Sequence, residues 1–475
     1  MLLYNKKRKS ERSLTFKKTI PKGCVLMGTD IIVAGAGHGG LSAAYALSKN
    51  GYNVTVYERS EEEKLGHDWH DYFEVKSFSA AGFPLPSTGV TDRIPIAYYG
   101  PDPDLPPLCQ NDQAGVFEMY MPRKDIYKHL IHHCKKVGVK FVFGCDILGP
   151  AVLGDRVVGI KTSLGDFYAD LVVDSAGIDS PLRKNLSEYF LLDKEFKKYD
   201  ILYTYRGIYK RLPDVDFDGP VYRVYLSDDG SVGLKWCVTY DDYVDILIGR
   251  FEPFGSDTIN SVTAELRKIN PHLSDELIRG GQVVKIPVRQ SPAVLVANGY
   301  ASVGDSAAMT MPLMGSGIAS SLKAGAMLAK AVMADKNRCY SAETLWKYEV
   351  DYMKNIGFNY ASVALIKDLL PTLKKEDVDF FFREGILTSS DMAFSAEDSS
   401  LGALLTNITI PSIIERARKA TANPALLKKV AGVGVNFVKL KSVTSSFPTK
   451  YNRVAIEKWA EKYTSFFESV LDRSI

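Results

Sequence analysis

The first clear pattern in the chain is a strand–helix–strand unit near residue 30. Residues 29–34 (TDIIVA) form an apolar, β-branched run that ends at a glycine, which predicts a short buried strand. Residues 39–50 place apolar side chains at helical spacing and end at Asn-Gly, which stops a helix. Residues 53–58 (NVTVYE) predict a second strand. Together the three segments predict a βαβ unit.

The pattern changes several times further along the chain. Seven prolines leave residues 81–120 poor in backbone donors, so we expect an irregular excursion that forms a wall or lid over a site. Residues 200–285 contain several alternating apolar and polar runs separated by turn signals, which predicts an antiparallel sheet. We expect a strand, a turn and a helix within 297–334, and mostly helix over 340–475.

Composition excludes some classes of protein. The chain has 475 residues, is 46% hydrophobic and 24% charged, and carries a net charge of +3, which is typical of a globular protein and does not favour nucleic-acid binding. Its six cysteines form no CxxC pair and no apolar run reaches 18 residues, so we expect a reducing, cytoplasmic setting without a membrane span. Residues 1–27 are basic and show little apolar periodicity. This predicts either a disordered tail or a sequence that begins upstream of the natural first residue, which would then be Met27.

The strongest chemical signal is a GxGxxG motif at 35–40, which follows the first predicted strand and opens the first predicted helix. Gly35 permits a tight turn, Gly37 lets the backbone approach a pyrophosphate, and Gly40 allows close packing of helix on strand. The helix N-terminus adds free N–H groups and a positive dipole. The motif therefore predicts a dinucleotide site, and a glycine-lined packing turn is the alternative.

Two acids help to choose the dinucleotide. Glu58 ends the second predicted strand, where a carboxylate can accept hydrogen bonds from an adenosine ribose but disfavours a 2′-phosphate, which leaves FAD or NAD. In residues 301–318 (ASVGDSAAMTMPLMGSGI), Asp305 ends a strand and can bind a ribityl chain. The glycines that follow let backbone amides reach the pyrimidine edge of a flavin, and the helix start near Gly317 adds its dipole. This second motif favours FAD.

In these motifs the chain resembles the flavoprotein superfamily of 4-hydroxybenzoate hydroxylase and, within it, the geranylgeranyl reductases. The family's motifs occur in the expected order: GxGxxG with Glu58, then Arg123, then DSAGIDSPLR at 174–183, then Gly304-Asp305. The resemblance covers residues 28–345 and implies that Arg123 lies beside the FAD and that Asp305 binds its ribityl chain. The residues that we expect at the cofactor are Gly35, Ala36, Gly37, His38, Gly39, Gly40, Glu58, Arg59, Arg123, Gly177, Gly304, Asp305, Pro312, Gly315, Ser316, Gly317 and Ile318.

The chain departs from the family in two places. Ala176-Gly177 stands where the hydroxylases of the superfamily carry Asp-Gly, and this form resembles the reductases better. The segment LKWCVT at 234–239 keeps the tryptophan of the reductases' YxWxFP motif as Trp236 but lacks its Phe-Pro. The halogenase motif WxWxIP is absent from the sequence. The reaction type is thus better indicated than the lipid substrate.

Pattern and resemblance together predict an α/β fold with a doubly wound, Rossmann-like FAD-binding domain, an antiparallel β-sheet substrate domain and a helical C-terminal region. We expect the FAD-binding domain to be discontinuous, built from 28–80, 121–199 and 286–345. The proline-rich excursion (81–120) and the sheet domain (200–285) are inserted between these parts. Residues 346–475 form the helical region.

The segment GHDWHDYF at 66–73 places two histidines, His67 and His70, beside two aspartates. Such a group can bind a metal, but no third histidine or cysteine follows at ligand spacing and the expected chemistry requires none. We therefore expect no metal. A solvated polar loop is one interpretation, and a position near the substrate, together with Trp236, is the other.

Residues 416–456 contain nine basic and no acidic residues, interleaved with apolar ones. This mixture suits an anionic membrane surface or a diphosphate-bearing lipid, and it equally suits a helical domain with a solvated basic exterior. A peripheral position on a membrane is therefore one of two open interpretations.

The resemblance implies an FAD-dependent oxidoreductase that reduces carbon–carbon double bonds of a prenyl, geranylgeranyl-type lipid, with electrons from NAD(P)H or ferredoxin. The sequence identifies no catalytic proton donor, since tyrosine, cysteine and histidine are all available. One alternative is an FAD-dependent monooxygenase that hydroxylates an aromatic or lipid substrate. The other is a non-catalytic lipid-binding protein that contains FAD.

Overall fold

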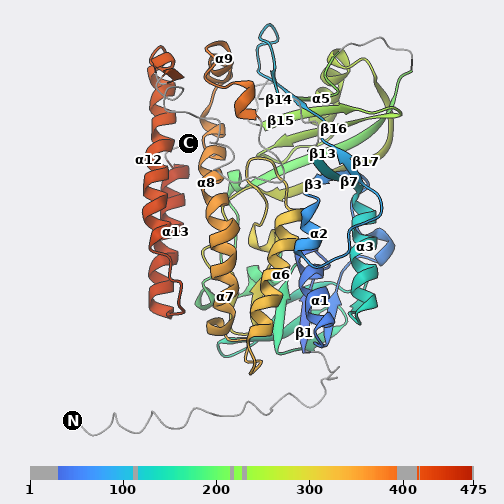
Figure 1. Ribbon diagram of the computed structural model, residues 1–475, viewed down its shortest axis with the longest axis vertical. Coiled ribbons are helices and arrows are strands. Elements are labelled where there is room, and N and C mark those ends of the chain that lie inside the picture. The colour runs from blue at the N-terminus through green and yellow to red at the C-terminus, as the bar shows by residue number, and fades with distance from the viewer. Residues whose placement is uncertain are drawn as a thin grey trace, which may run out of the picture.

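The computed structural model describes residues 30–110, 116–213, 219–226, 233–392, 415–416 and 418–472. The predicted tail 1–27 lies outside these residues. A six-stranded sheet forms one lobe (Figure 1). In spatial order its strands are β18 (Val296–Ala297), β19 (Tyr300–Ser302), β12 (Leu171–Asp174), β1 (Ile31–Ala34), β2 (Val54–Tyr57) and β8 (Lys140–Val142). All its neighbouring strands are parallel except β18 and β19, and β1 is buried throughout, as the continuous apolar run of its sequence requires.

Helices cover this sheet. They are α1 (His38–Lys49), α3 (Arg123–Lys136) and α6 (Ile318–Ala334). A glycine brings α1 and α6 close together, because a Cβ on Gly325 would lie 2.2 Å from the carbonyl oxygen of Gly39. The β1–α1–β2 unit confirms the predicted strand–helix–strand pattern, and the lobe is the expected Rossmann-like domain.

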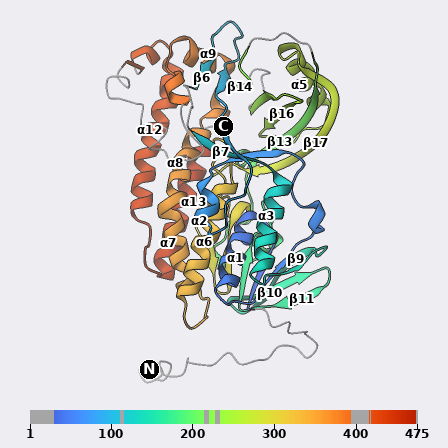
Figure 2. The ribbon, with the colours of Figure 1, turned by 45° about the vertical axis from the view of Figure 1, so that its right-hand side comes forward.

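A seven-stranded sheet forms the second lobe (Figures 1 and 2). Its order is β17 (Leu273–Pro287), β13 (Ile201–Arg211), β16 (Tyr243–Arg250), β15 (Gly233–Thr239), β14 (Tyr222–Leu226), β5 (Ile96–Tyr99) and β6 (Leu108–Cys109). Helix α5 (Ser256–Ile269) packs on one face and buries Val262 and Leu266 against Cys237 and Ile246. The predicted antiparallel sheet is confirmed over 200–285, while β5 adds a parallel strand beside β14.

The expectation of an irregular excursion at 81–120 is wrong, because this segment contributes four strands: β4 (Val90–Asp92), β5, β6 and β7 (Phe117–Pro122). Its prolines lie outside these ladders or, at Pro122, end one, so the missing N–H groups cost the sheets little. Strands β4 and β7 join β3 (His70–Phe73) in a small sheet between the two lobes (Figure 1).

The remaining elements are shorter or lie outside these sheets. A three-stranded sheet consists of β9 (Ile147–Leu153), β10 (Arg156–Thr162) and β11 (Gly165–Tyr168). Short helices are α2 (Lys76–Ala80) and α4 (Pro181–Asn185). The helical C-terminal region comprises α7 (Ala342–Tyr352), a π-helical turn (Met353–Gly357), α8 (Phe358–Lys367), α9 (Lys375–Arg383), α12 (Pro424–Ser445) and α13 (Arg453–Asp472). Single 3₁₀ turns occupy Glu62–Lys64, Glu188–Phe190, Lys198–Asp200, Gly304–Ala307, Leu370–Thr372 and Ser389–Met392.

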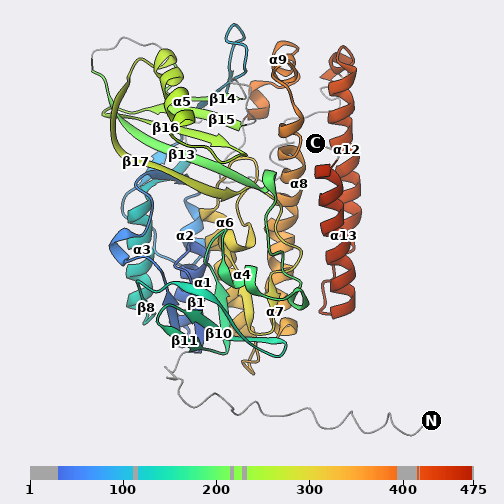
Figure 3. The ribbon, with the colours of Figure 1, turned by 180° about the vertical axis from the view of Figure 1, so that it is seen from behind.

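Helices α12 and α13 form an outer layer beside α7 and α8, along the length of the molecule (Figures 1 and 3). This arrangement confirms the predicted helical C-terminal region. Among the helices that the structure describes, none is both long and apolar enough to cross a membrane.

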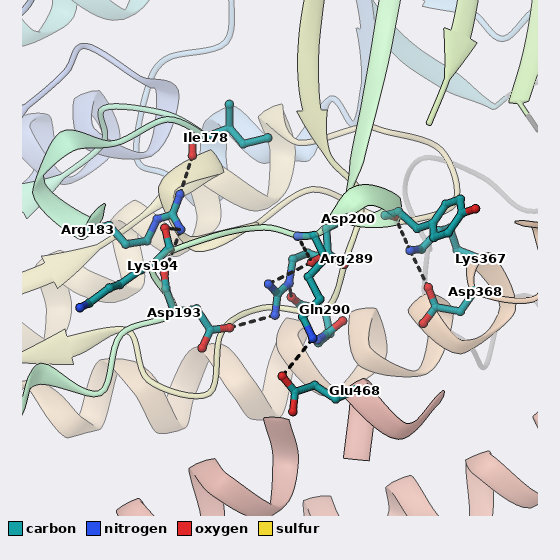
Figure 4. Close-up of polar contacts among 12 residues, drawn as sticks. Ile178, Arg183, Asp193, Lys194, Asp200, Arg289, Gln290, Lys367, Asp368 and Glu468 are labelled. Atoms are coloured by element: carbon teal, nitrogen blue, oxygen red, sulfur yellow. Dashed lines mark hydrogen bonds and ion pairs between the residues drawn. The ribbon is translucent and has the colours of Figure 1, made fainter. Parts of the chain in front are cut away.

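A polar network lies between the segments around Asp193 and Arg289 and the helical layer (Figure 4). Arg289 donates hydrogen bonds to Asp193 (2.9 Å) and Asp200 (3.2 Å), and these carboxylates raise the pKa of Arg289 even though burial opposes the charge. Because a buried charge is costly unless it is paired, the two carboxylates hold the Arg289 side chain in place. Close by, Lys197 binds Glu468 of α13 at 3.0 Å, but this pair is exposed and contributes little to the position of the helix.

Candidate functional site

The glycine-rich turn between β1 and α1 packs against the DSAG segment that follows β12. Gly35 has φ +90°, and a Cβ there would lie 2.5 Å from the carbonyl oxygen of Ser175. A Cβ on Gly40 would lie 2.6 Å from the Ser175 Cβ and 2.7 Å from Val33 in β1, so the close helix–strand packing predicted for Gly40 is confirmed. These positions require glycine because backbone or core atoms occupy the space of a side chain.

Glu58 is buried at the end of β2 and is held by the backbone. One carboxylate oxygen accepts a hydrogen bond from the Ala36 N–H at 2.8 Å, and the other accepts one from the Ser60 N–H at 2.9 Å. The carboxylate is thereby fixed beside the glycine-rich turn, where the sequence placed it. The neighbouring Arg59 is exposed.

His38 is the first residue of α1, and its ring lies 4.7 Å from that of Tyr127. Burial, reinforced by the nearby Arg123, lowers the pKa of His38 to about 3, so the imidazole is neutral at physiological pH. Its Nε2 atom is buried and has no hydrogen-bond partner among the described residues. A buried polar atom without a partner at a helix N-terminus is suited to binding a ligand.

The second glycine-rich segment follows β19. Gly304 has φ +76°, and Asp305 accepts a hydrogen bond from the Thr310 hydroxyl at 3.2 Å. Burial raises the pKa of Asp305, although Arg123 acts in the opposite direction. A Cβ on Gly317 would lie 2.8 Å from the Thr310 hydroxyl oxygen, so a side chain there would displace the hydroxyl that donates to Asp305.

One cavity of about 440 Å³ connects this segment to the seven-stranded sheet. The sheet contributes Thr204, Tyr222, Trp236 and Leu247, among others. Of the residues predicted at the cofactor, those that line the cavity are His38, Arg123, Asp305, Gly315, Ser316, Gly317 and Ile318. Those that do not line it are Gly35, Ala36, Gly37, Gly39, Gly40, Glu58, Arg59, Gly177, Gly304 and Pro312.

The three residues predicted on the substrate side have different positions. Trp236 and His67 line the cavity. His67 stacks on Trp69 at 4.4 Å and makes a 3.3 Å hydrogen bond with Gln282. His70 does not line the cavity and instead stacks on Tyr120 at 4.6 Å, within a cluster of tyrosines.

The segment GHDWHDYF shows no metal-binding arrangement. Asp68 pairs with Lys124 at 3.3 Å, and Asp71 pairs with Arg123, so these two aspartates are used in separate ion pairs. Within the described part of the chain, no group of three or more histidine, cysteine or acidic side chains is placed to hold a metal ion.

A row of alternating charges crosses the cavity wall. Arg123 donates two hydrogen bonds to Asp71 (2.6 and 2.7 Å), and Arg206 donates two to Asp245 (3.0 and 2.6 Å). The two pairs are linked, because Arg206 Nη1 lies 3.8 Å from Asp71. Burial alone would raise the pKa of Asp71, but Arg123 and Arg206 lower it below its usual value. Arg123 is therefore a cavity residue and not a surface helix arginine.

Sequence reasoning missed Arg206 and Asp245 as site residues, while Asp71 was considered only as part of the GHDWHDYF segment. A signal for the first two was present, since Arg206 and Asp245 are charged positions inside apolar strand runs (YTYRGIY and VDILIGR). A charge at such a position is buried in a sheet only if it has a partner. Which strand supplies the partner depends on the pairing of β13 with β16, which the sequence does not specify.

The residues present fit an FAD molecule at both of its ends. The glycine-rich turn, Glu58 and the unpartnered His38 suit the adenosine diphosphate half, and Asp305 with the 315–317 segment suits the flavin half. A Rossmann-like domain joined to an antiparallel sheet and a helical C-terminal region is the fold of the FAD-dependent oxidoreductases.

Comparisons with known proteins agree with this class. The family model described as an NAD(P)-binding Rossmann-like domain matches residues 33–79. The digeranylgeranylglycerophospholipid reductase of Sulfolobus acidocaldarius is 22% identical over 88% of this chain and 93% of its own length. The protein of the same name from Haloferax volcanii is 26% identical over 67% of this chain and 80% of its own length.

Solved structures show the same fold. A geranylgeranyl bacteriochlorophyll reductase-like protein from Thermoplasma acidophilum superposes with a TM-score of 0.66 at 18% identity, over 85% of this chain and 98% of that one. A probable FAD-dependent monooxygenase from Pseudomonas aeruginosa superposes with a TM-score of 0.53 at 20% identity, over 72% of this chain and 96% of that one. The predicted resemblance to the geranylgeranyl reductases is confirmed.

Proposed function

We propose that this protein is an FAD-dependent reductase of carbon–carbon double bonds in a prenyl lipid of the geranylgeranyl type. The observation that carries the proposal is the single cavity that joins the Asp305 and 315–318 segments to the inner face of the seven-stranded sheet. It is supported by relatives named digeranylgeranylglycerophospholipid reductase that match over most of the chain.

The FAD would extend from the first glycine-rich turn to the second. Glu58 would accept hydrogen bonds from the adenosine ribose, the N-terminus of α1 would bind the pyrophosphate, and Asp305 would accept hydrogen bonds from the ribityl hydroxyls. When bound and reduced, the cofactor supplies a hydride. The chain's part is to position the lipid, exclude water and provide a proton.

The cavity suits the hydrocarbon part of such a lipid. Its basic side chains each pair with a carboxylate: Arg93 with Glu118, Arg123 with Asp71, Arg206 with Asp245, Lys285 with Asp179, and Lys323 with Glu74. A wall of neutralised pairs with apolar side chains between them, such as Leu247 and Met311, offers little attraction to an anionic head group. The head group would therefore remain outside while the prenyl chain enters.

The outer face of α12 would hold the protein on an anionic membrane, where such lipids are found. This 22-residue helix buries only Leu426, Leu440 and Val443. Its exposed surface carries Val435 (54% exposed) and Val438 (72% exposed), with Lys428, Lys439 and Lys441 also exposed. An apolar strip flanked by lysines matches the interfacial layer of a bilayer with anionic lipids.

The test is an anaerobic reaction of the dithionite-reduced protein with digeranylgeranylglycerophospholipid, followed by mass spectrometry. We expect a gain of two hydrogens for each reduced double bond. NAD(P)H and reduced ferredoxin, supplied in separate reactions in place of dithionite, would identify the physiological donor. The Gly317→Ala variant, whose new Cβ falls 2.8 Å from Thr310, should bind FAD poorly and lose the reaction. Gly432→Ala is its control, since a Cβ there meets nothing within 4 Å.

Three results would overturn the proposal. A gain of one oxygen, seen only in air, would make the protein a monooxygenase. A bound flavin that no reductant bleaches would indicate a lipid-binding protein with inert FAD. A colourless protein that does not take up FAD would remove the basis of both functions.

A further inference from the structure

Four tyrosines form a connected cluster between the small sheet and the seven-stranded sheet. The hydroxyls of Tyr72 and Tyr240 are 2.6 Å apart, and those of Tyr120 and Tyr243 are also 2.6 Å apart. The rings of Tyr120 and Tyr240 stack at 5.5 Å, which places the two pairs side by side. The four hydroxyls therefore form two hydrogen-bonded pairs, Tyr72 with Tyr240 and Tyr120 with Tyr243.

Strand pairing fixes this cluster. Tyr72 in β3 lies directly opposite Tyr120 in β7, and their rings stack at 4.4 Å. Tyr240 and Tyr243 flank the turn between β15 and β16, where the Tyr240 N–H donates to the Tyr243 carbonyl at 2.8 Å. Strand pairing and this backbone hydrogen bond therefore fix where the four tyrosine side chains lie.

The two members of the Tyr72–Tyr240 pair differ in their surroundings. Tyr72 lines the cavity that also contains Asp305 and Gly317. Tyr240 is half-buried and is followed by the turn residues Asp241 and Asp242, which are exposed to solvent. The pair thus extends from the cavity towards the molecular surface.

We propose that Tyr72 donates the proton that completes reduction of the double bond, and that Tyr240, whose hydroxyl lies 2.6 Å away, returns a proton to it from solvent. This inference rests on the proposed function, which needs a proton donor that the sequence alone did not identify. Cys109 and Cys237 do not line the cavity, and His67 already bonds to Gln282.

The proposed step balances as follows. The π bond of the alkene breaks, one carbon receives the hydride and its two electrons from the reductant of the proposed function, and the other carbon receives the Tyr72 proton. The Tyr72 O–H bond breaks, and the resulting phenolate takes a proton from Tyr240. Tyr240 in turn takes a proton from water. The alkene is reduced by two electrons and the tyrosines are unchanged.

The electrostatics keep the donor protonated until it is needed. Burial raises the pKa of Tyr72 above its usual value, and the nearby carboxylates Asp245 and Glu118 raise it further, while the hydrogen bond with Tyr240 acts in the opposite direction. A phenol with a raised pKa holds its proton over the physiological pH range. Since such a phenol is a weak acid, proton transfer has to accompany hydride transfer and does not precede it.

The experiment compares the full-length variants Tyr72→Phe and Tyr240→Phe in the anaerobic assay with reduced protein and digeranylgeranylglycerophospholipid. The matched control is Tyr205→Phe, which removes one hydroxyl of another buried tyrosine pair, Tyr205–Tyr209 (2.9 Å), in the seven-stranded sheet. We expect Tyr72→Phe to lower kcat roughly 10²-fold with KM unchanged. Tyr240→Phe should complete a first reduction at the normal rate and slow the later ones, because Tyr72 is present but is no longer resupplied.

The remaining outcomes distinguish failure of the proposed function from failure of the proton relay. If the wild-type protein reduces no double bond, the proposed function fails. If the wild type reduces the lipid and both variants match Tyr205→Phe in kcat and in every turnover, the relay fails and the proposed function stands. Bound FAD, its absorbance spectrum and the unfolding temperature are measured for all variants. If Tyr72→Phe does not fold, the turnover pattern of Tyr240→Phe decides.

Discussion

The hydroxyl of Ser175 accepts a hydrogen bond from the backbone N–H of Gly40 at 3.1 Å. This contact joins the DSAG segment to the GxGxxG turn, two motifs that are 135 residues apart in the sequence. The N-terminal part of α1 therefore depends on a segment that follows β12, and the first predictions concern this joint.

Gly40→Ala should destabilise the protein and weaken FAD binding. The new Cβ would lie 2.6 Å from the Ser175 Cβ and 2.7 Å from Val33, so α1 has to move away from β1. Overpacking of this kind costs about 1–3 kcal/mol, which urea unfolding with and without FAD can measure. In Gly432→Ala the same change meets open space on a helix, and the free energy of unfolding should stay equal or rise by up to about 1 kcal/mol. Equal stability of the two variants would contradict this prediction.

Glu58→Ala should lower both stability and FAD affinity. It leaves the N–H groups of Ala36 and Ser60 without their carboxylate acceptor, which costs about 1–3 kcal/mol for a buried group. Glu58→Gln keeps one acceptor oxygen and should fall between the wild type and Glu58→Ala. Titration of the apoprotein with FAD provides the measurement. An unchanged FAD dissociation constant in Glu58→Ala would show that this carboxylate does not contact the ribose.

The ion pair of Asp71 with Arg123 should make stability depend on acid pH. Because the folded state lowers the pKa of Asp71, its contribution is fully present above the usual carboxyl value of about 4 and is lost as pH falls through the lowered value. Asp71→Asn leaves Arg123 and Arg206 without this charge and should cost about 3–5 kcal/mol at pH 7. Urea unfolding at neutral and acid pH checks this: the penalty of the substitution should shrink on the acid side, and a constant penalty would exclude the linkage.

Glu349 should make stability depend on pH with the opposite sign. Burial in α7 raises the pKa of Glu349 to about 8, while its carboxylate accepts the Leu295 N–H at 2.8 Å. The folded state therefore keeps the proton between about pH 4.5 and pH 8, where the unfolded chain loses it, so stability falls as pH rises through this range. Glu349→Gln copies the neutral form and should be more stable than the wild type at pH 8 but not at pH 5, as thermal unfolding at both values would show.

The exposed strip on α12 should be needed for binding to anionic vesicles. Val435→Asp and Val438→Asp remove apolar area and add negative charge beside the lysines, which should lower vesicle partitioning about 10-fold at low salt. Val152→Asp changes an exposed valine in β9 and serves as the control. Co-sedimentation with phosphatidylserine vesicles measures the effect. Equal partitioning of all the variants would mean that this basic region is only a solvated exterior.

Much of the cofactor half of the site could be predicted from the sequence because its constraints are local. A glycine such as Gly35 is required by a turn a few residues long, and Glu58 lies at the end of the next strand. The βαβ unit, the antiparallel sheet and the C-terminal helices follow from periodicities within single segments. Each of these depends on neighbouring residues alone.

The substrate half could not be predicted in the same way because it depends on which strands pair. Asp71 reaches Arg206 only because the small sheet lies beside the seven-stranded one, and Tyr72 reaches Tyr240 for the same reason. The strands within 81–120 do not stand out in the sequence because prolines lie between them, and proline disfavours both strand and helix. His70 is expected on the substrate side, but its ring stacks on Tyr120 and does not line the cavity.

The order of strands in the six-stranded sheet has a consequence for biosynthesis. Strand β1 pairs with β2 on one side and with β12 on the other. Strand β2 is synthesised soon after β1, but β12 leaves the ribosome more than a hundred residues later. The next neighbour of β12 in the sheet, β19, follows only at residues 300–302. A nascent chain that has been translated only through β8 therefore exposes an open, apolar strand edge. The protein has to complete most of its synthesis before this edge is covered, and during that interval the edge is open to pairing with other chains.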